Sequence, residues 1–104
     1  MSSELIVKEE INADYVKVTL IGEIDIYTAQ TLKDKLYGIV ETNQTDLRFE
    51  CGGLNYIDST GLGIFVGVLK KTKQYGKNIY LDKLKDNIRK LFVITGLDKL
   101  FIIG

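Results

Sequence analysis

The sequence contains no histidine, and this absence bears directly on catalysis. Histidine is the usual base that activates a serine nucleophile, and the local sequence places no lysine to replace it. Asp25 and Asp58 are candidates for a general acid and base pair, but their spacing gives no sign that they converge. We therefore expect that this chain is not an enzyme.

The sequence has a single cysteine, Cys51, which excludes an internal disulfide. Clusters of cysteine and histidine are missing too, so we expect neither a structural zinc site nor another cofactor. Cys51 lies among apolar strand residues, which indicates a buried thiol in a reducing compartment. No segment approaches the roughly 20 apolar residues that cross a bilayer, and residues 1–10 are not typical of an export signal. These features predict a cytoplasmic protein with no membrane partner.

Proline, low-complexity segments and internal repeats are absent, so long linkers are not expected. The 104 residues, 45% of them hydrophobic, suffice for one core, and we assign residues 1–104 to one domain. The net charge is zero, yet residues 1–50 carry 5 basic and 10 acidic side chains and residues 51–104 carry 9 and 4. Lys70, Lys71 and Lys73 are typical of a solvated helix face, and no nucleic-acid motif accompanies them. No nucleic-acid partner is predicted.

Apolar periodicity predicts an α/β fold. Strand-like alternation is found at residues 5–7, 15–20 and 47–51, and Gly52 with Gly53 is expected to end the third strand. Helical spacing follows Thr28, recurs over residues 62–69, and recurs again over residues 88–92 before Gly96; a fourth strand is expected at residues 77–81. Helices between the later strands imply right-handed crossovers. The predicted architecture is a mixed, mainly parallel sheet of four to five strands packed against helices.

An apolar strand turns into a helix at Ser59 and Thr60, and this junction is the most informative part of the chain. We predict that Ser59 lies at or near the helix N-cap. Unpaired backbone N–H groups and the positive end of the helix dipole favour a side-chain oxygen there, and would favour a phosphate more. The simpler interpretation is that Asp58 and Ser59 only form the turn and cap, as such residues commonly do.

The sequence Asp58-Ser59-Thr60-Gly61-Leu62-Gly63 resembles the signature of the anti-sigma factor antagonists of the STAS domain family, which reads Asp-Ser-Ser/Thr-Gly-Leu-Gly after a strand. Gly22-Glu23-Ile24-Asp25 and Thr95-Gly96-Leu97-Asp98-Lys99-Leu100-Phe101 are similar to the same family, in its order and spacing. The resemblance covers nearly the entire chain and implies the same mixed sheet. Relatives usually continue into a last helix, whereas this sequence stops at Gly104. We therefore expect the last helix to be missing and residues 101–103 to be partly exposed.

The resemblance implies that Ser59 accepts a phosphate from a partner anti-sigma factor that is also a serine kinase using ATP and magnesium. The unphosphorylated chain would bind that partner and free a bacterial sigma factor; phosphorylation would release it, and a serine phosphatase would reset it. Thr60 is the alternative acceptor. For Asp25 a cap or turn role is as good an interpretation, and for Leu62 and Ile64 simple burial is the alternative. The predicted partner-binding residues are Asp25, Asn55, Tyr56, Asp58, Ser59, Thr60, Gly61, Leu62 and Ile64.

Other STAS domains suggest two further roles. A scaffold subunit of a signalling assembly would self-associate stably, and an accessory module of a transport complex would have a ligand pocket or a membrane partner. The intact signature and the bare single domain favour the switch. We expect a monomer, with a weak dimer as the alternative.

Overall fold

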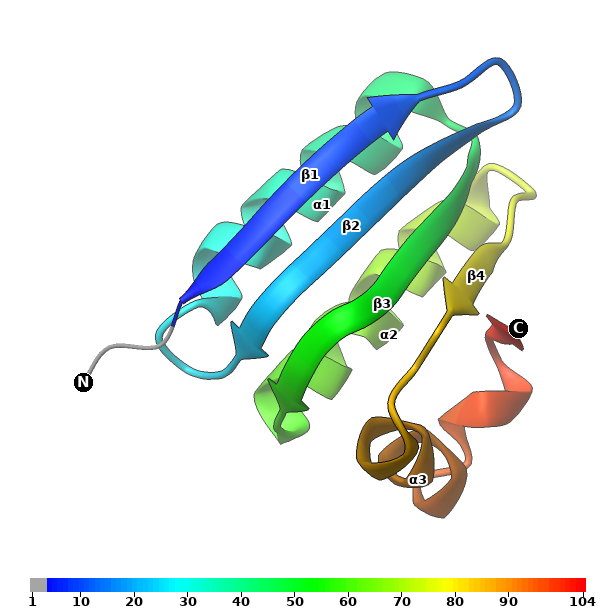
Figure 1. Cartoon of the computed structure of the whole chain (residues 1–104). Helices are drawn as coiled ribbons and strands as arrows, with labels where there is room; N and C mark the ends of the chain where they lie inside the picture. The colour runs from blue at the N-terminus through cyan, green and yellow to red at the C-terminus, as the bar shows by residue number, and fades with distance from the viewer. Residues whose placement is uncertain (1–3) are drawn as a thin grey trace.

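A sheet of five strands forms one layer, and two long helices cover one of its faces (Figure 1). The computed structural model describes residues 4–104. The strands are β1 (Leu5–Ile11), β2 (Tyr15–Ile24), β3 (Asp46–Ile57), β4 (Ile79–Asp82) and β5 (Ile102–Ile103). The helices are α1 (Ala29–Asn43), α2 (Ser59–Gln74) and α3 (Asp86–Ile94), and a 3-10 turn, η1 (Leu97–Lys99), precedes β5.

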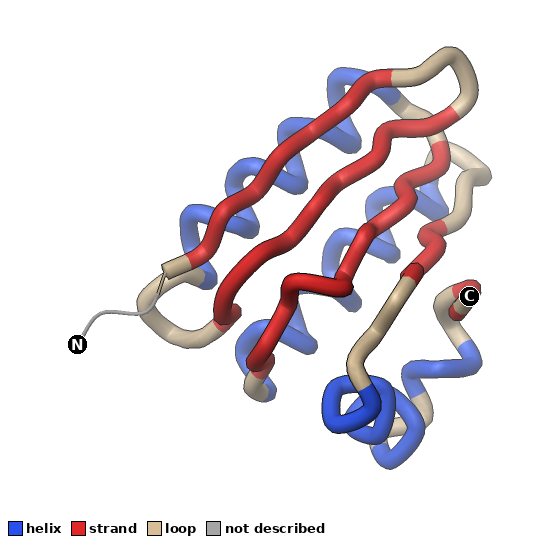
Figure 2. Tube along the Cα trace, in the orientation of Figure 1, coloured by secondary structure: helices blue, strands red, loops and turns tan. Residues whose placement is uncertain are grey.

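The strands lie in the order β1-β2-β3-β4-β5. β1 and β2 form an antiparallel hairpin, and every later neighbour pair is parallel, so the predicted mixed and mainly parallel sheet is confirmed. Figure 2 shows α1 and α2 behind the sheet and α3 beyond the end of β4. Because β2 and β3 run in parallel, their carboxyl ends meet at one edge of the sheet, where Ile24 lies opposite Ile57.

Side chains alternate across the sheet, and the buried set faces the helices. Val16, Val18 and Leu20 on β2 are fully buried, and in β3 burial recurs at every second residue from Leu47 to Cys51. Four phenylalanines, Phe49, Phe65, Phe92 and Phe101, meet edge to face in neighbouring pairs with ring centroids 5.1 to 6.2 Å apart. This cluster ties α2, α3 and the chain end to the sheet.

The two helices behind the sheet are also joined at their surface. Lys71 on α2 lies 2.6 Å from Glu41 on α1, and the Tyr75 hydroxyl donates a hydrogen bond of 2.7 Å to the same carboxylate. These two hydrogen bonds lower the pKa of Glu41. Close by, the Tyr37 hydroxyl occupies the space that a side chain at Gly67 would need. The α1 and α2 backbones can therefore approach closely.

β3 is longer than predicted. The expectation that Gly52 and Gly53 end this strand is wrong, because β3 continues through them to Ile57. Its register with β2 shifts between Thr19 and Ile21, and a β-carbon on Gly53 would meet the Ile21 side chain at 3.0 Å. The glycines thus allow an irregularity within the strand rather than a stop. As a result, the strand reaches the junction at Asp58.

The chain end also differs from the prediction. Phe101 is only 5% exposed, because it packs against Phe65 and Phe92, so its expected exposure is wrong. Ile102 is 44% exposed, as expected. The fourth strand begins at Ile79 rather than at residue 77. None of the helices in residues 4–104 is long and apolar enough to cross a membrane.

Candidate functional site

Helix α2 begins directly at the carboxyl end of β3. Asp58 is its N-cap, and its Oδ1 accepts a hydrogen bond of 3.0 Å from the Gly61 N–H. The Asp58 N–H donates in turn to the Ile24 carbonyl at 3.3 Å, which fixes the junction to the end of β2. The cap interpretation of Asp58 is therefore confirmed, and Ser59 is the first residue of the helix.

Ser59 and Thr60 are both exposed, but their surroundings differ. Among the described residues, none makes a hydrogen bond to the Ser59 side chain, and no acidic residue lies in the first turn of α2 itself. Thr60 lines a groove of about 270 Å³ between α1 and α2, together with Lys33 and Gly63. The two candidate acceptors thus lie in different settings, and Ser59 is not among the residues that line the groove.

Gly61 allows α2 to begin so close to the sheet. A β-carbon at this position would lie 2.6 Å from side-chain carbons of both Ile24 and Ile57. Atoms cannot lie this close, so a residue with a β-carbon would force α2 or its neighbours to move. Only glycine therefore allows α2 to begin at this position. Leu62 and Ile64 follow in the core, each 8% exposed. Their burial favours the alternative of simple burial, whereas Ile64 also lines the groove between α1 and α2, and their contact with a partner stays a prediction.

Asp25 organises the loop between β2 and α1. Its Oδ1 accepts hydrogen bonds from the N–H groups of Tyr27 and Thr28, at 2.8 and 3.3 Å. The Thr28 hydroxyl donates to the Glu23 carbonyl at 2.9 Å and accepts from the Asp25 N–H at 3.0 Å. Asp25 is therefore a turn carboxylate, as one interpretation predicted. Thr28 precedes α1 but closes the turn instead of capping the helix with its side chain.

Asn55 and Tyr56 are exposed and lie within β3, near its end, rather than in a loop after a shorter strand. The Asn55 side-chain oxygen accepts a hydrogen bond from Lys85, which precedes α3. Sequence reasoning missed Lys85, and it also missed Ile26 and Tyr27, which are 66% and 73% exposed in the β2–α1 loop. An isoleucine and a tyrosine directly after a turn carboxylate were the available signal. These residues extend the exposed surface at the carboxyl edge of the sheet.

The STAS domain model matches residues 5–104 of the chain. This chain belongs to the STAS domain family. It is similar to the anti-sigma-B factor antagonist of Bacillus subtilis (strain 168), with 42% identity over 86 residues, which are 83% of this chain and 78% of that protein. The unphosphorylated form of the anti-sigma factor antagonist SpoIIAA has the same fold, with a TM-score of 0.82 at 19% identity over 95% of this chain and 88% of that one. The phosphorylated form of the Bacillus protein SpoIIAA matches with a TM-score of 0.75 at 19% identity. The match covers 95% of this chain and 91% of that one.

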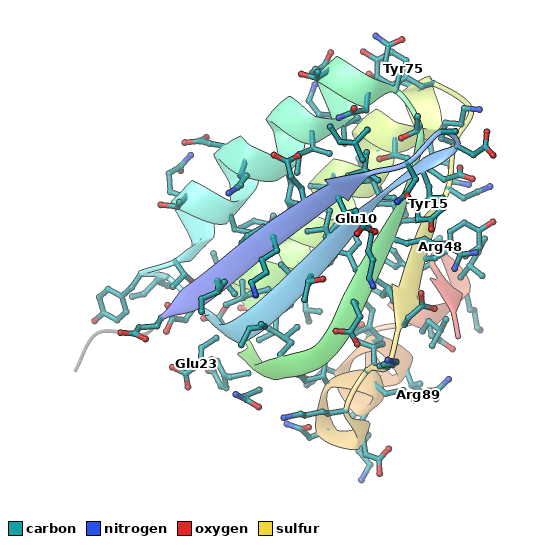
Figure 3. All side chains as sticks on the ribbon, turned by 45° about the horizontal axis from the view of Figure 1, so that its top comes forward. Glu10, Tyr15, Glu23, Arg48, Tyr75 and Arg89 are labelled. Atoms are coloured by element: carbon teal, nitrogen blue, oxygen red, sulfur yellow. The ribbon has the colours of Figure 1, made fainter. Side chains whose placement is uncertain are left out.

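A larger hollow of this STAS domain lies on the uncovered face of the sheet, away from the helices. It measures about 770 Å³, and Tyr15, Arg48 and Asp82 are among its lining residues. Figure 3 labels Tyr15 and Arg48. The Arg48 guanidinium lies over the ring of Tyr80 at 4.1 Å, over that of Tyr15 at 5.7 Å, and 3.5 Å from Asp82. Arg48 is thus held by two aromatic rings and one carboxylate, while 41% of its side chain stays exposed.

Cys51 lies inside the STAS core and not at the junction. Burial raises the pKa of its thiol to about 12, and the charges of Glu50 and Asp82 add to the rise. Among residues 4–104 no three histidine, cysteine, aspartate or glutamate side chains converge on a point where they could hold a metal ion. The junction between β3 and α2 can therefore contact a partner through the Ser59 hydroxyl, the N-terminus of α2 and nearby exposed apolar side chains.

Proposed function

We propose that this STAS domain is an anti-sigma factor antagonist that works as a partner switch controlled by phosphorylation of Ser59. In the unphosphorylated state it binds an anti-sigma factor that is also a serine kinase, and so frees a sigma factor. Phosphorylation releases it, and a serine phosphatase restores the first state. The observation that carries this proposal is the exposed Ser59 hydroxyl, without a hydrogen-bond partner among the described residues, at the first position of α2.

The similarity to anti-sigma-B factor antagonists supports the role, and the existence of a phosphorylated SpoIIAA supports the modification. The division of tasks at the junction adds a physical reason. Asp58 already satisfies the cap through Gly61, so the Ser59 hydroxyl is available to an incoming phosphoryl donor. An unengaged hydroxyl can be modified without loss of an internal hydrogen bond.

The surface around Ser59 suits a switch between bound and free states. Ile26, Tyr27 and Tyr56 expose apolar surface at the same edge of the sheet, and aromatic side chains of this kind commonly anchor protein interfaces. A phosphate adds about 1.5 to 2 negative charges, which would have to be desolvated against the partner. Asp58 adds repulsion beside it. The same surface therefore binds while Ser59 is free and is expected to lose affinity after modification.

In this proposal the chain is the substrate of the kinase and not a catalyst. The γ-phosphoryl group of ATP, bound with magnesium on the partner, passes to the Ser59 oxygen, the hydroxyl proton leaves, and ADP remains on the kinase. The phosphatase later transfers the phosphoryl group to water. The absence of histidine from the sequence supports this assignment.

The test is to incubate the purified chain with its candidate kinase and magnesium ATP and to locate the added phosphate by peptide mapping. We expect one phosphate on Ser59, none on the Ser59→Ala variant, and unchanged modification of Thr60→Val, the matched variant of the neighbouring hydroxyl. Loss of modification in Thr60→Val with retention in Ser59→Ala would assign the site to Thr60 instead. No modification and no binding of unmodified chain would overturn the proposal.

A further inference from the structure

Strand β1 forms one edge of the sheet, and the register with β2 shows which of its backbone groups point outward. The Asn12 N–H donates to Tyr15, and the Glu4 carbonyl accepts from Glu23. In an antiparallel pair every second residue makes these bonds, so the even-numbered residues of β1 bond to β2. The N–H and C=O groups of the odd-numbered residues face outward, namely Leu5, Val7, Glu9 and Ile11.

This outward row is open to another strand. Among the described residues, its one hydrogen bond comes from the Lys35 ammonium group on α1, which lies 3.5 Å from the Val7 carbonyl, at the outer limit for such a bond. Ile11, at the end of the row, is 66% exposed. Long exposed edges of this kind are templates for pairing with a further strand.

Helix α1 carries a glycine beside this edge that the single chain does not explain. Gly38 lies in the interior of the helix, where glycine destabilises relative to alanine, yet nothing lies within 4 Å of the position that a β-carbon would take. Gly38 lines a groove with Glu9 and Lys35, between β1 and α1. The glycine at this open position is explained if the backbone of a second protein molecule packs against it.

We propose that the β1 edge is a two-fold interface between two copies of this chain. The two β1 strands pair antiparallel about an axis at Glu9, so that Val7 lies opposite Ile11 of the second copy and Lys8 lies opposite its Glu10. Both contacts occur twice by symmetry. The sheets join into one, and the two α1 helices lie side by side at Gly38.

The charges select this register among those that use the outward row. Lys8 and Glu10 project to the uncovered face of the sheet, on the side away from the partly buried Leu5 and Val7 (Figure 3 labels Glu10). They are paired across the axis in positions without hydrogen bonds, where side chains lie closest. If the two-fold axis moved by one residue along β1, Lys8 would lie opposite Lys8 of the second copy, or Glu10 would lie opposite its Glu10. This register also places Glu9 opposite Glu9 of the second copy at the axis, and Lys35, which lines the same groove in each chain, supplies a positive charge nearby.

The interface leaves the proposed switch accessible. Ser59 follows the carboxyl end of β3, the third strand in the sheet order from the β1 edge, so pairing of the β1 strands does not cover Ser59 itself. Tyr27 lies nearer the interface, because it lines a groove together with Leu5 and Val7. The Ser59 hydroxyl thus stays accessible in both copies, and the test of the dimer does not depend on phosphorylation or on any kinase.

The test is sedimentation velocity of the unphosphorylated chain over a series of rising concentrations. We expect a reversible dimer, and Lys8→Glu, whose β2 neighbour is the uncharged Thr19, should weaken dimerisation by about tenfold or more because two attractive cross-strand pairs become repulsive. The double variant Lys8→Glu/Glu10→Lys should restore it. Lys90→Glu, the same charge change on the exposed face of α3, should leave the association unchanged.

A second variant tests the helix contact. Gly38→Gln should raise the melting temperature, because glycine is removed from a helix interior, and should weaken the dimer, because the new side chain occupies the space between the α1 helices. A chain that stays monomeric at every concentration, or a double variant that fails to recover association while its melting temperature is normal, would overturn the proposed interface.

Discussion

At the start of α2 the structure separates the residue that caps the helix from the residue that we propose as the phosphate acceptor. Asp58 takes the cap, since its carboxylate holds the Gly61 N–H at 3.0 Å. Ser59 at the positive end of α2 then keeps a hydroxyl that makes no hydrogen bond within residues 4–104. A phosphate there would sit beside Asp58 rather than replace it, so modification need not undo the start of the helix.

The raised pKa of the Cys51 thiol predicts that the free energy of unfolding depends on pH. Its pKa rises from an ordinary value of 9.0 to about 12 in the folded chain, so the unfolded chain loses this proton at lower pH than the folded chain does. The stabilisation by the neutral buried thiol is complete below about pH 9 and is lost as pH rises toward 12. We expect Cys51 to lower the free energy of unfolding by up to about 1.4 kcal/mol per pH unit in this range.

The measurement is urea unfolding at several alkaline pH values, for the natural chain and for Cys51→Ala. The variant is less stable at neutral pH because it loses buried volume, but its free energy of unfolding should fall less steeply with rising pH. Equal slopes for the two chains would show that the thiol ionises alike in both states. Alkylation offers a direct control, since Cys51 should react with iodoacetamide only after unfolding.

At the scale of the element, helix α2 depends on a single side-chain cap. Replacing Asp58 with alanine removes the acceptor for the Gly61 N–H, and we expect a loss of about 1 kcal/mol in the free energy of unfolding. Asp58→Asn retains an acceptor oxygen and should lose much less. Asp14→Ala, at an exposed turn residue, is the matched control and should change stability by less than about 0.5 kcal/mol. Equal losses in Asp58→Ala and Asp14→Ala, measured by urea unfolding, would argue against the cap.

The elements also show what periodicity can and cannot predict. The alternation in β2 and the helical spacing of α2 are local signals, and both elements lie where the sequence predicted them. β3 runs on past Gly53 because its register with β2 shifts there, which is a property of two strands and not of one. Gly96, in contrast, follows α3 as predicted and has a positive φ angle, as Gly76 has after α2.

At the scale of the whole molecule, the site is assembled by topology. The junction at Ser59 could be predicted from contiguous residues, but the proximity of the Asp25 loop follows from the parallel pairing of β2 with β3. Lys85 reaches Asn55 only because α3 lies beyond the end of β4 (Figure 1). The burial of Phe101 likewise arises from packing against α2 and α3. Such contacts depend on the three-dimensional arrangement, so local patterns did not predict them.

The same arrangement predicts how the molecule responds to a negative charge at Ser59. In Ser59→Asp the new carboxylate is exposed at the N-terminus of α2, where the helix dipole favours it by roughly 0.3 to 1 kcal/mol, and no internal hydrogen bond is lost. We therefore expect helicity and melting temperature close to those of the natural chain, with affinity for the kinase partner strongly reduced. Circular dichroism and titration calorimetry measure the two effects separately, and Ser59→Ala is the control without charge. A large loss of helicity in Ser59→Asp would mean that the charge acts on the fold itself, and the switch would then be a change of conformation rather than of the binding surface.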